Sequence, residues 1–149
     1  LAQQGDPSKF KFAKPHIPGL DYSFSGLKTS FLYTLRDEKK KNENFVKENM
    51  ADLAASLQRT IIDILIDKLD KAVKQTGIKT VAIGGGVSAN SGVRQAVADY
   101  CTRNGLKAFI PPRKFTTDNA AMVAIAGHFK ALNGEYCSLD AVPFARVTV

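Results

Sequence analysis

The sequence predicts an α/β fold in which a long helix precedes two strand-helix units, in the order β-α-β-α. Two short apolar runs, at 79–83 and 106–110, each lead into a glycine- or proline-containing turn and then a helical pattern. A longer apolar stripe at helical spacing runs from 49 to 75. Because crossovers between parallel strands are right-handed, we expect the turns after both strands to open on the same carboxyl edge of the sheet.

Length and composition limit the chain to one domain. With 149 residues and 44% hydrophobic content, it can bury one core but is too short for two domains of ordinary size. The opening Leu1 to Pro7 resembles the end of a helix running into a loop, so we expect a single partial domain from a longer protein. We divide residues 1–149 into a basic loop with proline and glycine at 1–24, helices at 25–76, a β-α-β-α unit at 78–133 and a tail at 134–149.

Charge and cysteine content restrict the class of partner and the compartment. The 21 Lys and Arg against 14 Asp and Glu give a net charge of +7, which favours anionic partners such as nucleotides or nucleic acid. Cys101 and Cys137 stand in no metal-binding or disulfide pattern, which indicates reduced intracellular thiols. Without an apolar run of membrane-spanning length or a signal peptide, we expect a cytoplasmic protein with no membrane partner.

The helices before the first strand are predicted from their caps and apolar spacing. Three prolines in the first 24 residues prevent a long helix there and favour an extended loop that is ordered by docking. Ser25 is expected to cap the first helix, and Gly77 to end the long one. The charged face of the long helix is interpreted as a solvated surface; its members are Asp52, Gln58, Arg59, Asp63, Asp67, Lys68, Lys71 and Lys74.

The turn after the first strand is the strongest functional signal from the residues alone. Three glycines at 84–86 precede Asn90, which is expected to cap the next helix and, turned outward, to hydrogen-bond a nucleotide. Glycine leaves backbone N–H groups open to close approach by a phosphate. The turn matches neither a Walker A loop nor a GxGxxG fingerprint, and close packing alone is an alternative explanation.

The turn after the second strand carries one acidic residue, Asp118, at a helix start. An N-cap role would explain it, and a metal-binding or catalytic role is the alternative. His16 and His128 are isolated in the sequence, and no Ser/His/Asp or Cys/His arrangement is present, so no catalytic side chain is predicted in this chain.

Three blocks taken together resemble the carboxyl-terminal part of the TsaD family, the threonylcarbamoyl transferases that modify tRNA. They are Asp21-Tyr22-Ser23-Phe24-Ser25-Gly26-Leu27-Lys28-Thr29, then Gly85-Gly86-Val87-Ser88-Ala89-Asn90 with Arg94, then Thr117-Asp118-Asn119-Ala120-Ala121-Met122. The resemblance covers essentially the whole chain but less than half of a usual family member. It implies an actin-like fold of two RNase H-like lobes around a nucleotide cleft, with this chain as the carboxyl-terminal portion of a lobe.

The resemblance also implies an activity and its partners. The whole enzyme would move a threonylcarbamoyl group from threonylcarbamoyl-AMP to the exocyclic amine of the adenosine beside the anticodon of tRNA. One divalent metal ion, iron or zinc, would orient the intermediate, and auxiliary proteins of the threonylcarbamoylation complex would assist. Two alternatives stay open: a nucleotide- or tRNA-binding module without chemistry, and a metal-dependent glycoprotein endopeptidase.

Residue by residue, the resemblance implies that Asn90 contacts the adenylate, that Gly85 and Gly86 line it, and that Asp118 ligates the metal ion. The family's HxxxH metal pair does not occur here, so the remaining ligands must come from outside this chain. We therefore expect the chain alone to be inactive. We also expect it to self-associate, by pairing of an exposed strand edge or by exchange of the first 24 residues.

Overall fold

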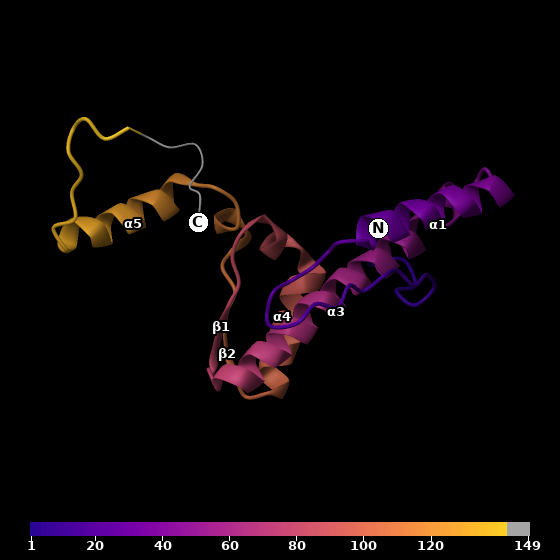
Figure 1. Cartoon of the computed structure of the whole chain (residues 1–149), viewed down its shortest axis with the longest axis horizontal. Coiled ribbons are helices and arrows are strands. Elements are labelled where there is room, and N and C mark those ends of the chain that lie inside the picture. Colours follow the sequence, from indigo (N-terminus) through magenta and orange to yellow (C-terminus); the bar gives the residue numbers. More distant parts are fainter. Residues whose placement is uncertain (143–149) are drawn as a thin grey trace.

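The longest helix, α3 (Met50–Thr76), is the central element of the computed structural model, which describes residues 1–142. The other elements are α1 (Leu27–Lys41), α2 (Phe45–Glu48), β1 (Thr80–Ala82), α4 (Ser91–Arg103), β2 (Lys107–Phe109) and α5 (Ala120–Leu132), with 3-10 turns at Gly86–Ala89 and Arg113–Phe115. The 27 residues of α3 span about 40 Å, and Figure 1 shows α4 and the two strands beside one end of it and α1 near the other. Part of the expected tail, 143–149, lies outside the described residues.

The two strands confirm the predicted α/β fold with a β-α-β-α order. β1 and β2 pair in parallel, with Thr80 opposite Lys107 and Ala82 opposite Phe109. Helix α4 makes the crossover between them, and α5 follows β2. Both strands are three residues long, shorter than the apolar runs that predicted them.

Two apolar clusters hold the structure together, and α3 contributes to both. The first packs α4 and the sheet against the carboxyl half of α3; its buried members are Val81, Val93, Val97, Tyr100, Cys101 and Leu106. The second packs the first residues of the chain, α1 and α2 against the amino half of α3; its buried members are Phe12, Leu27, Phe45, Leu53 and Ile64. The predicted stripe of α3 therefore does face the core, although most of its side chains remain half-buried.

Of the two boundary residues predicted for the helices before β1, one is confirmed and the other is wrong. Gly77 ends α3 in a left-handed conformation (φ 68°) and donates its N–H to the carbonyl of Val73 at 2.9 Å. Ser25 does not cap α1, because the helix begins one residue later. Gly26, with φ 80°, is the residue that precedes the first helical turn, and no side chain caps it.

The first 20 residues, which we call the N-terminal strap, run along α3 and are fastened to its polar face. Near the amino end of α3, Asp52 accepts hydrogen bonds from the backbone N–H of Asp6 (2.8 Å) and from Lys9 Nζ (2.6 Å). One turn further, Ser56 Oγ accepts the N–H of Phe10 at 3.1 Å. The interpretation of this face as merely solvated is therefore wrong for Asp52, whereas the exposed Arg59, Asp67 and Lys74 fit it.

The strap is also held near its far end, by a buried lysine. Lys68 is only 4% exposed, and its Nζ donates to the carbonyls of Ile17 and Gly19 at 2.7 Å each. Between these anchors, Lys14 pairs with Asp63. An ammonium group that donates to main-chain oxygens costs far less to bury than an unpaired one. The charged face of α3 thus orders the proline-containing segment that precedes the 21–29 block.

Helix α5 is the exception to this packing. Figure 1 shows it extending from the end of the molecule opposite α1, with no other helix of residues 1–142 against it. None of its residues is buried, and five large apolar side chains are exposed: Met122 (51%), Val123 (71%), Ile125 (52%), Phe129 (60%) and Leu132 (69%). A helix that is apolar on all sides is normally covered by other protein. Among residues 1–142, no helix combines the length and apolarity that crossing a membrane requires.

We expect the chain to self-associate through α5, because burying each large apolar side chain favours association by about 1.5–3 kcal/mol. The strap is already fastened to α3 of its own chain, which makes exchange of the first 24 residues a less favoured route. Sedimentation velocity should show concentration-dependent oligomers. The double variant Ile125→Lys/Phe129→Lys should shift the chain to monomer, while Leu32→Lys/Tyr33→Lys on α1 should not. A wild-type chain that stays monomeric at high concentration contradicts the expectation.

Candidate functional site

The glycine turn after β1 is a tight 3-10 turn closed by a buried serine. Gly85 has φ 79° and ψ 171°, a backbone conformation that is accessible almost only to glycine. Its carbonyl accepts both the N–H of Ser88 (3.0 Å) and the Oγ of Ser88 (2.7 Å). Ser88 is 3% exposed, so its side chain holds the turn from the interior of the protein, while the glycines of the turn are exposed.

Asn90 caps α4, as the sequence predicts. Its Oδ1 accepts the backbone N–H of Val93 at 3.1 Å. Its Nδ2 donates to Gln58 Oε1 of α3 at 3.1 Å, a contact that the sequence did not predict. The side chain is thus oriented by two protein partners, and a ligand that bonds the amide would replace the contact with Gln58.

The second junction, between β2 and α5, does not use its acidic residue as the cap. Asn119 caps α5 instead, with its Oδ1 accepting the N–H of Met122 at 3.1 Å. The N-cap explanation for Asp118 is therefore wrong. The junction is fixed by Thr116, which is 3% exposed and donates its Oγ1 to the carbonyl of Arg113 at 2.7 Å.

The two junctions line one cavity of about 270 Å³ at the carboxyl edge of the sheet. Its lining residues are Gly85, Gly86, Phe115, Thr116, Thr117, Asp118 and Met122. The predicted convergence of the two turns on one edge is thus what the structure shows, and it brings Gly85 and Gly86 together with Asp118. Asn90 does not belong to the described lining of this cavity and lies on the α3 side of the glycine turn.

The first block of the resemblance, 21–29, lies elsewhere. Ser25, Gly26 and Lys28 are exposed at the start of α1. Ser23 lines a separate hollow of about 280 Å³ together with His16 and Lys68. The part of the chain that the structure describes therefore does not bring this block to the cavity at the sheet edge.

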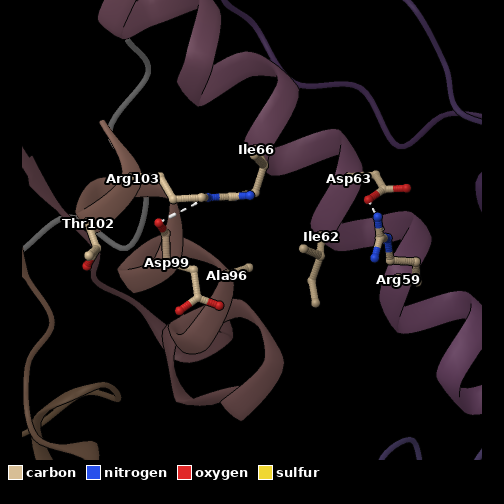
Figure 2. A pocket seen from close by; sticks show the side chains of 8 residues that line it. All are labelled: Arg59, Ile62, Asp63, Ile66, Ala96, Asp99, Thr102 and Arg103. Carbon is tan, nitrogen blue, oxygen red and sulfur yellow. Dashed lines mark hydrogen bonds and ion pairs between the residues drawn. The ribbon is translucent and has the colours of Figure 1, made fainter. Parts of the chain in front are cut away.

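A larger hollow, of about 520 Å³, lies between α3 and α4 (Figure 2). Ile62, Ile66 and Ala96 give it an apolar lining. Its two arginines bond to groups of their own helices, with Arg59 Nε donating to Asp63 at 2.7 Å and Arg103 Nε to the carbonyl of Asp99 at 3.3 Å. Asp63 also pairs with Lys14 of the strap. We prefer the smaller cavity as the site, because two strand-end junctions converge there and ligands of open parallel sheets bind at strand ends.

The cysteines and histidines do not contribute to the cavity among the residues described. Cys101 and Cys137 are free thiols, and Cys101 is 1% exposed in the first apolar cluster. Burial raises the pKa of the Cys101 thiol, which keeps it protonated and unreactive. His128 is exposed on α5, and His16 lies in the strap.

The described residues do not form a complete metal centre. Within 1–142, no group of three or more His, Cys, Asp and Glu side chains is placed to hold a metal ion. The cavity offers Asp118, and a single carboxylate supplies too few ligands for a transition metal. Of the implied metal site, this part of the chain can therefore provide one ligand.

We expect the chain alone to bind zinc weakly, with a dissociation constant above about 10 µM, since one carboxylate cannot compete with water for the ion. Isothermal titration at neutral pH measures this directly. A sub-micromolar site that disappears in Asp118→Ala but persists in Asp99→Ala, which removes an exposed carboxylate of α4, would contradict the expectation.

Fold and cavity define an α/β protein with a ligand-sized hollow beyond the carboxyl ends of two parallel strands, the first of which leads into a glycine turn, an arrangement typical of nucleotide-binding proteins. The family model described as TsaD, tRNA N6-adenosine threonylcarbamoyltransferase, matches residues 1–125. The chain belongs to the TsaD family, whose fold is actin-like.

Curated relatives with the same description support this assignment over nearly the whole chain. Proteins named tRNA N6-adenosine threonylcarbamoyltransferase are 58% identical in Porphyromonas gingivalis and 52% identical in Phocaeicola vulgatus, both over 149 residues and 100% of this chain. Another from Christiangramia forsetii is 53% identical over 97% of the chain. The chain spans about 44% of the length of the first two relatives and 43% of the third.

Proposed function

We propose that this chain is the carboxyl-terminal part of a tRNA-modifying transferase that uses threonylcarbamoyl-AMP. In the proposed reaction, the exocyclic amine of the adenosine beside the anticodon attacks the carbamoyl carbon. A carbon–nitrogen bond forms, the carbon–oxygen bond to the phosphate breaks, AMP leaves, and the amine loses a proton. The names of the relatives support the transferase class and tRNA as substrate, and no observation favours the endopeptidase alternative.

The observation that carries the proposal is the shared cavity of Gly85, Gly86 and Asp118. Backbone N–H groups of a glycine turn suit the phosphate of an adenylate, because they donate hydrogen bonds and no Cβ blocks the approach. Such groups would also stabilise negative charge that develops on the leaving phosphate. In this role the chain provides binding and electrostatic stabilisation, and no nucleophilic side chain is needed.

Further contacts to the nucleotide and to a metal ion belong to the proposed site. Asn90, at the end of the glycine turn, contacts the nucleotide by exchanging its hydrogen bond to Gln58. Asp118 contributes one carboxylate to a divalent iron or zinc ion whose other ligands lie outside the described residues. Auxiliary proteins of the threonylcarbamoylation complex and a cytoplasmic location, where tRNA is modified, belong to the same proposal.

The test uses a chimera in which this chain replaces the aligned 149 residues of the 58%-identical relative. With the adenylate-forming enzyme, the auxiliary proteins, labelled threonine and tRNA, the chimera should transfer label to tRNA. Asp118→Ala and Asn90→Ala should each lower the rate by at least about 100-fold, the size of effect typical of lost transition-state contacts.

The control for these variants is Asp99→Ala, which removes an exposed carboxylate of α4 away from the cavity and should leave transfer unchanged. A chimera that binds AMP but transfers nothing, under conditions in which the relative is active, would favour the non-catalytic module. Equal rates for Asp118→Ala and Asp99→Ala would remove Asp118 from the site.

A further inference from the structure

Arg94 of α4 contacts both junctions that line the cavity. Its Nη1 donates to the carbonyl of Ser88 in the glycine turn at 3.1 Å. Its Nη2 donates to the carbonyl of Pro111, at the start of the second junction, at 2.7 Å. One half-buried guanidinium group therefore joins two loops that are separated by 23 residues in the sequence (111 minus 88).

This bridge lies where the sheet no longer connects the two strands. The parallel ladder reaches its carboxyl end with the N–H of Ile83, which donates to the carbonyl of Phe109 at 3.1 Å. Past that hydrogen bond, the segments that follow β1 and β2 run into separate turns. Beyond it, Arg94 in the first turn of α4 connects the two turns through its two hydrogen bonds.

The stability of α4 does not explain an arginine at this position. Arg94 is the fourth residue of α4, in the first turn, where the positive end of the helix dipole disfavours a cation. Its hydrogen bonds go to two main-chain carbonyls outside the helix. The planar guanidinium can donate in two fixed directions at once, which a lysine ammonium on its single flexible stem reproduces poorly.

We propose that Arg94 is a positioning residue of the adenylate site, which acts through the backbone of the two turns and touches no substrate. The effect of Arg94 on adenylate binding rests on the proposed function. Its effect on the two turns does not. With Arg94 in place, Gly85 and Gly86 face Asp118 across the cavity. Without it, the two turns move independently, and Gly85 and Gly86 are no longer held opposite Asp118.

Hydrogen exchange of the full 149-residue chain, read by mass spectrometry, tests the structural content. Arg94→Met should raise exchange by about tenfold in both 84–90 and 111–119, the loss expected for a charged hydrogen-bonded bridge, and leave α3 unchanged. Arg94→Lys should rescue at most one of the two segments. Arg103→Met, which removes the arginine of the last turn of α4, should change neither. A rise in one segment only, in neither, or equally throughout α3 overturns the proposal.

Kinetics of the chimera test the consequence. Arg94→Met should raise the KM for threonylcarbamoyl-AMP by about tenfold and lower kcat less, because it loosens a binding site without removing a reacting group. If the wild-type chimera fails to bind AMP, the proposed function fails while the exchange result still decides the role of Arg94. If the wild-type chimera binds AMP and Arg94→Met binds it equally well, the positioning role fails alone.

Discussion

Lys68→Met is expected to lower the free energy of unfolding by about 2–3 kcal/mol, because it removes a charged donor from two main-chain carbonyls. Those carbonyls belong to Ile17 and Gly19 at the far end of the N-terminal strap. The strap should detach there first. Urea denaturation measures the loss of stability, and limited proteolysis should show faster cleavage between residues 14 and 24.

The matched control for this prediction is Lys71→Met on the same helix. The Lys71 side chain is 40% exposed and, among residues 1–142, forms an ion pair with Asp67 one turn away, an arrangement that contributes less than about 0.5 kcal/mol. Both variants are best compared in the Ile125→Lys/Phe129→Lys background, which is expected to be monomeric. Equal losses in the two variants would show that the buried lysine does not hold the strap.

Gly85→Ala is expected to abolish adenylate binding and to cost about 1–3 kcal/mol of stability, since no other residue type accepts φ 79° with ψ 171° readily. A Cβ at Gly85 would meet no heavy atom within 4 Å, so the effect comes from backbone strain and not from a clash. The turn should relax and move the N–H groups that face the cavity. Calorimetric titration of the chimera with AMP measures the affinity.

Substitutions at two neighbouring glycines distinguish backbone strain at Gly85 from the effect of an added methyl group. Gly84→Ala has open space and no positive φ, and Gly84 does not line the described cavity, so it should leave both stability and affinity nearly unchanged. Gly86→Ala also has open space, but it adds a methyl group at the cavity. It should therefore lower affinity without lowering stability. If Gly86→Ala binds AMP as wild type does, the phosphate does not approach this turn closely.

The order of elements and the convergence of the two turns could be predicted because they follow from local patterns and a handedness rule. Gly77 and Asn90 were predictable for the same reason, since each satisfies backbone groups of its own helix. The cap residues of α1 and α5 were not. Where adjacent residues can both cap, as Asp118 and Asn119 can, the turn leading into the helix decides which one does.

Contacts between distant segments were the main features that the sequence left undetermined. Lys68 and Gln58 look like members of a solvated helix face, and only the strap and the glycine turn beside them give these side chains partners. Arg94 belongs to the resemblance, yet its two acceptors are backbone carbonyls that no side-chain pattern encodes. The one available signal was its charge in the first turn of a helix, where a cation is disfavoured.

The exposure of α5 was also not predictable from its own sequence. Its small and apolar residues favour burial against other elements, and we expected exposed surface at a strand edge instead. The described residues instead leave the helix uncovered, while the chain spans less than half of its relatives. Packing that depends on the rest of a full-length protein cannot be read from one part of it.

The central claim is that the glycine turn and the Thr-Asp turn form one adenylate site. A crystal structure of the chimera with AMP tests it most directly. We expect the phosphate to lie against the backbone of Gly85 and Gly86 and the same ligand to reach the Thr117–Asp118 side of the cavity. An AMP molecule bound elsewhere, or one that contacts a single junction and leaves the other to solvent, would contradict it.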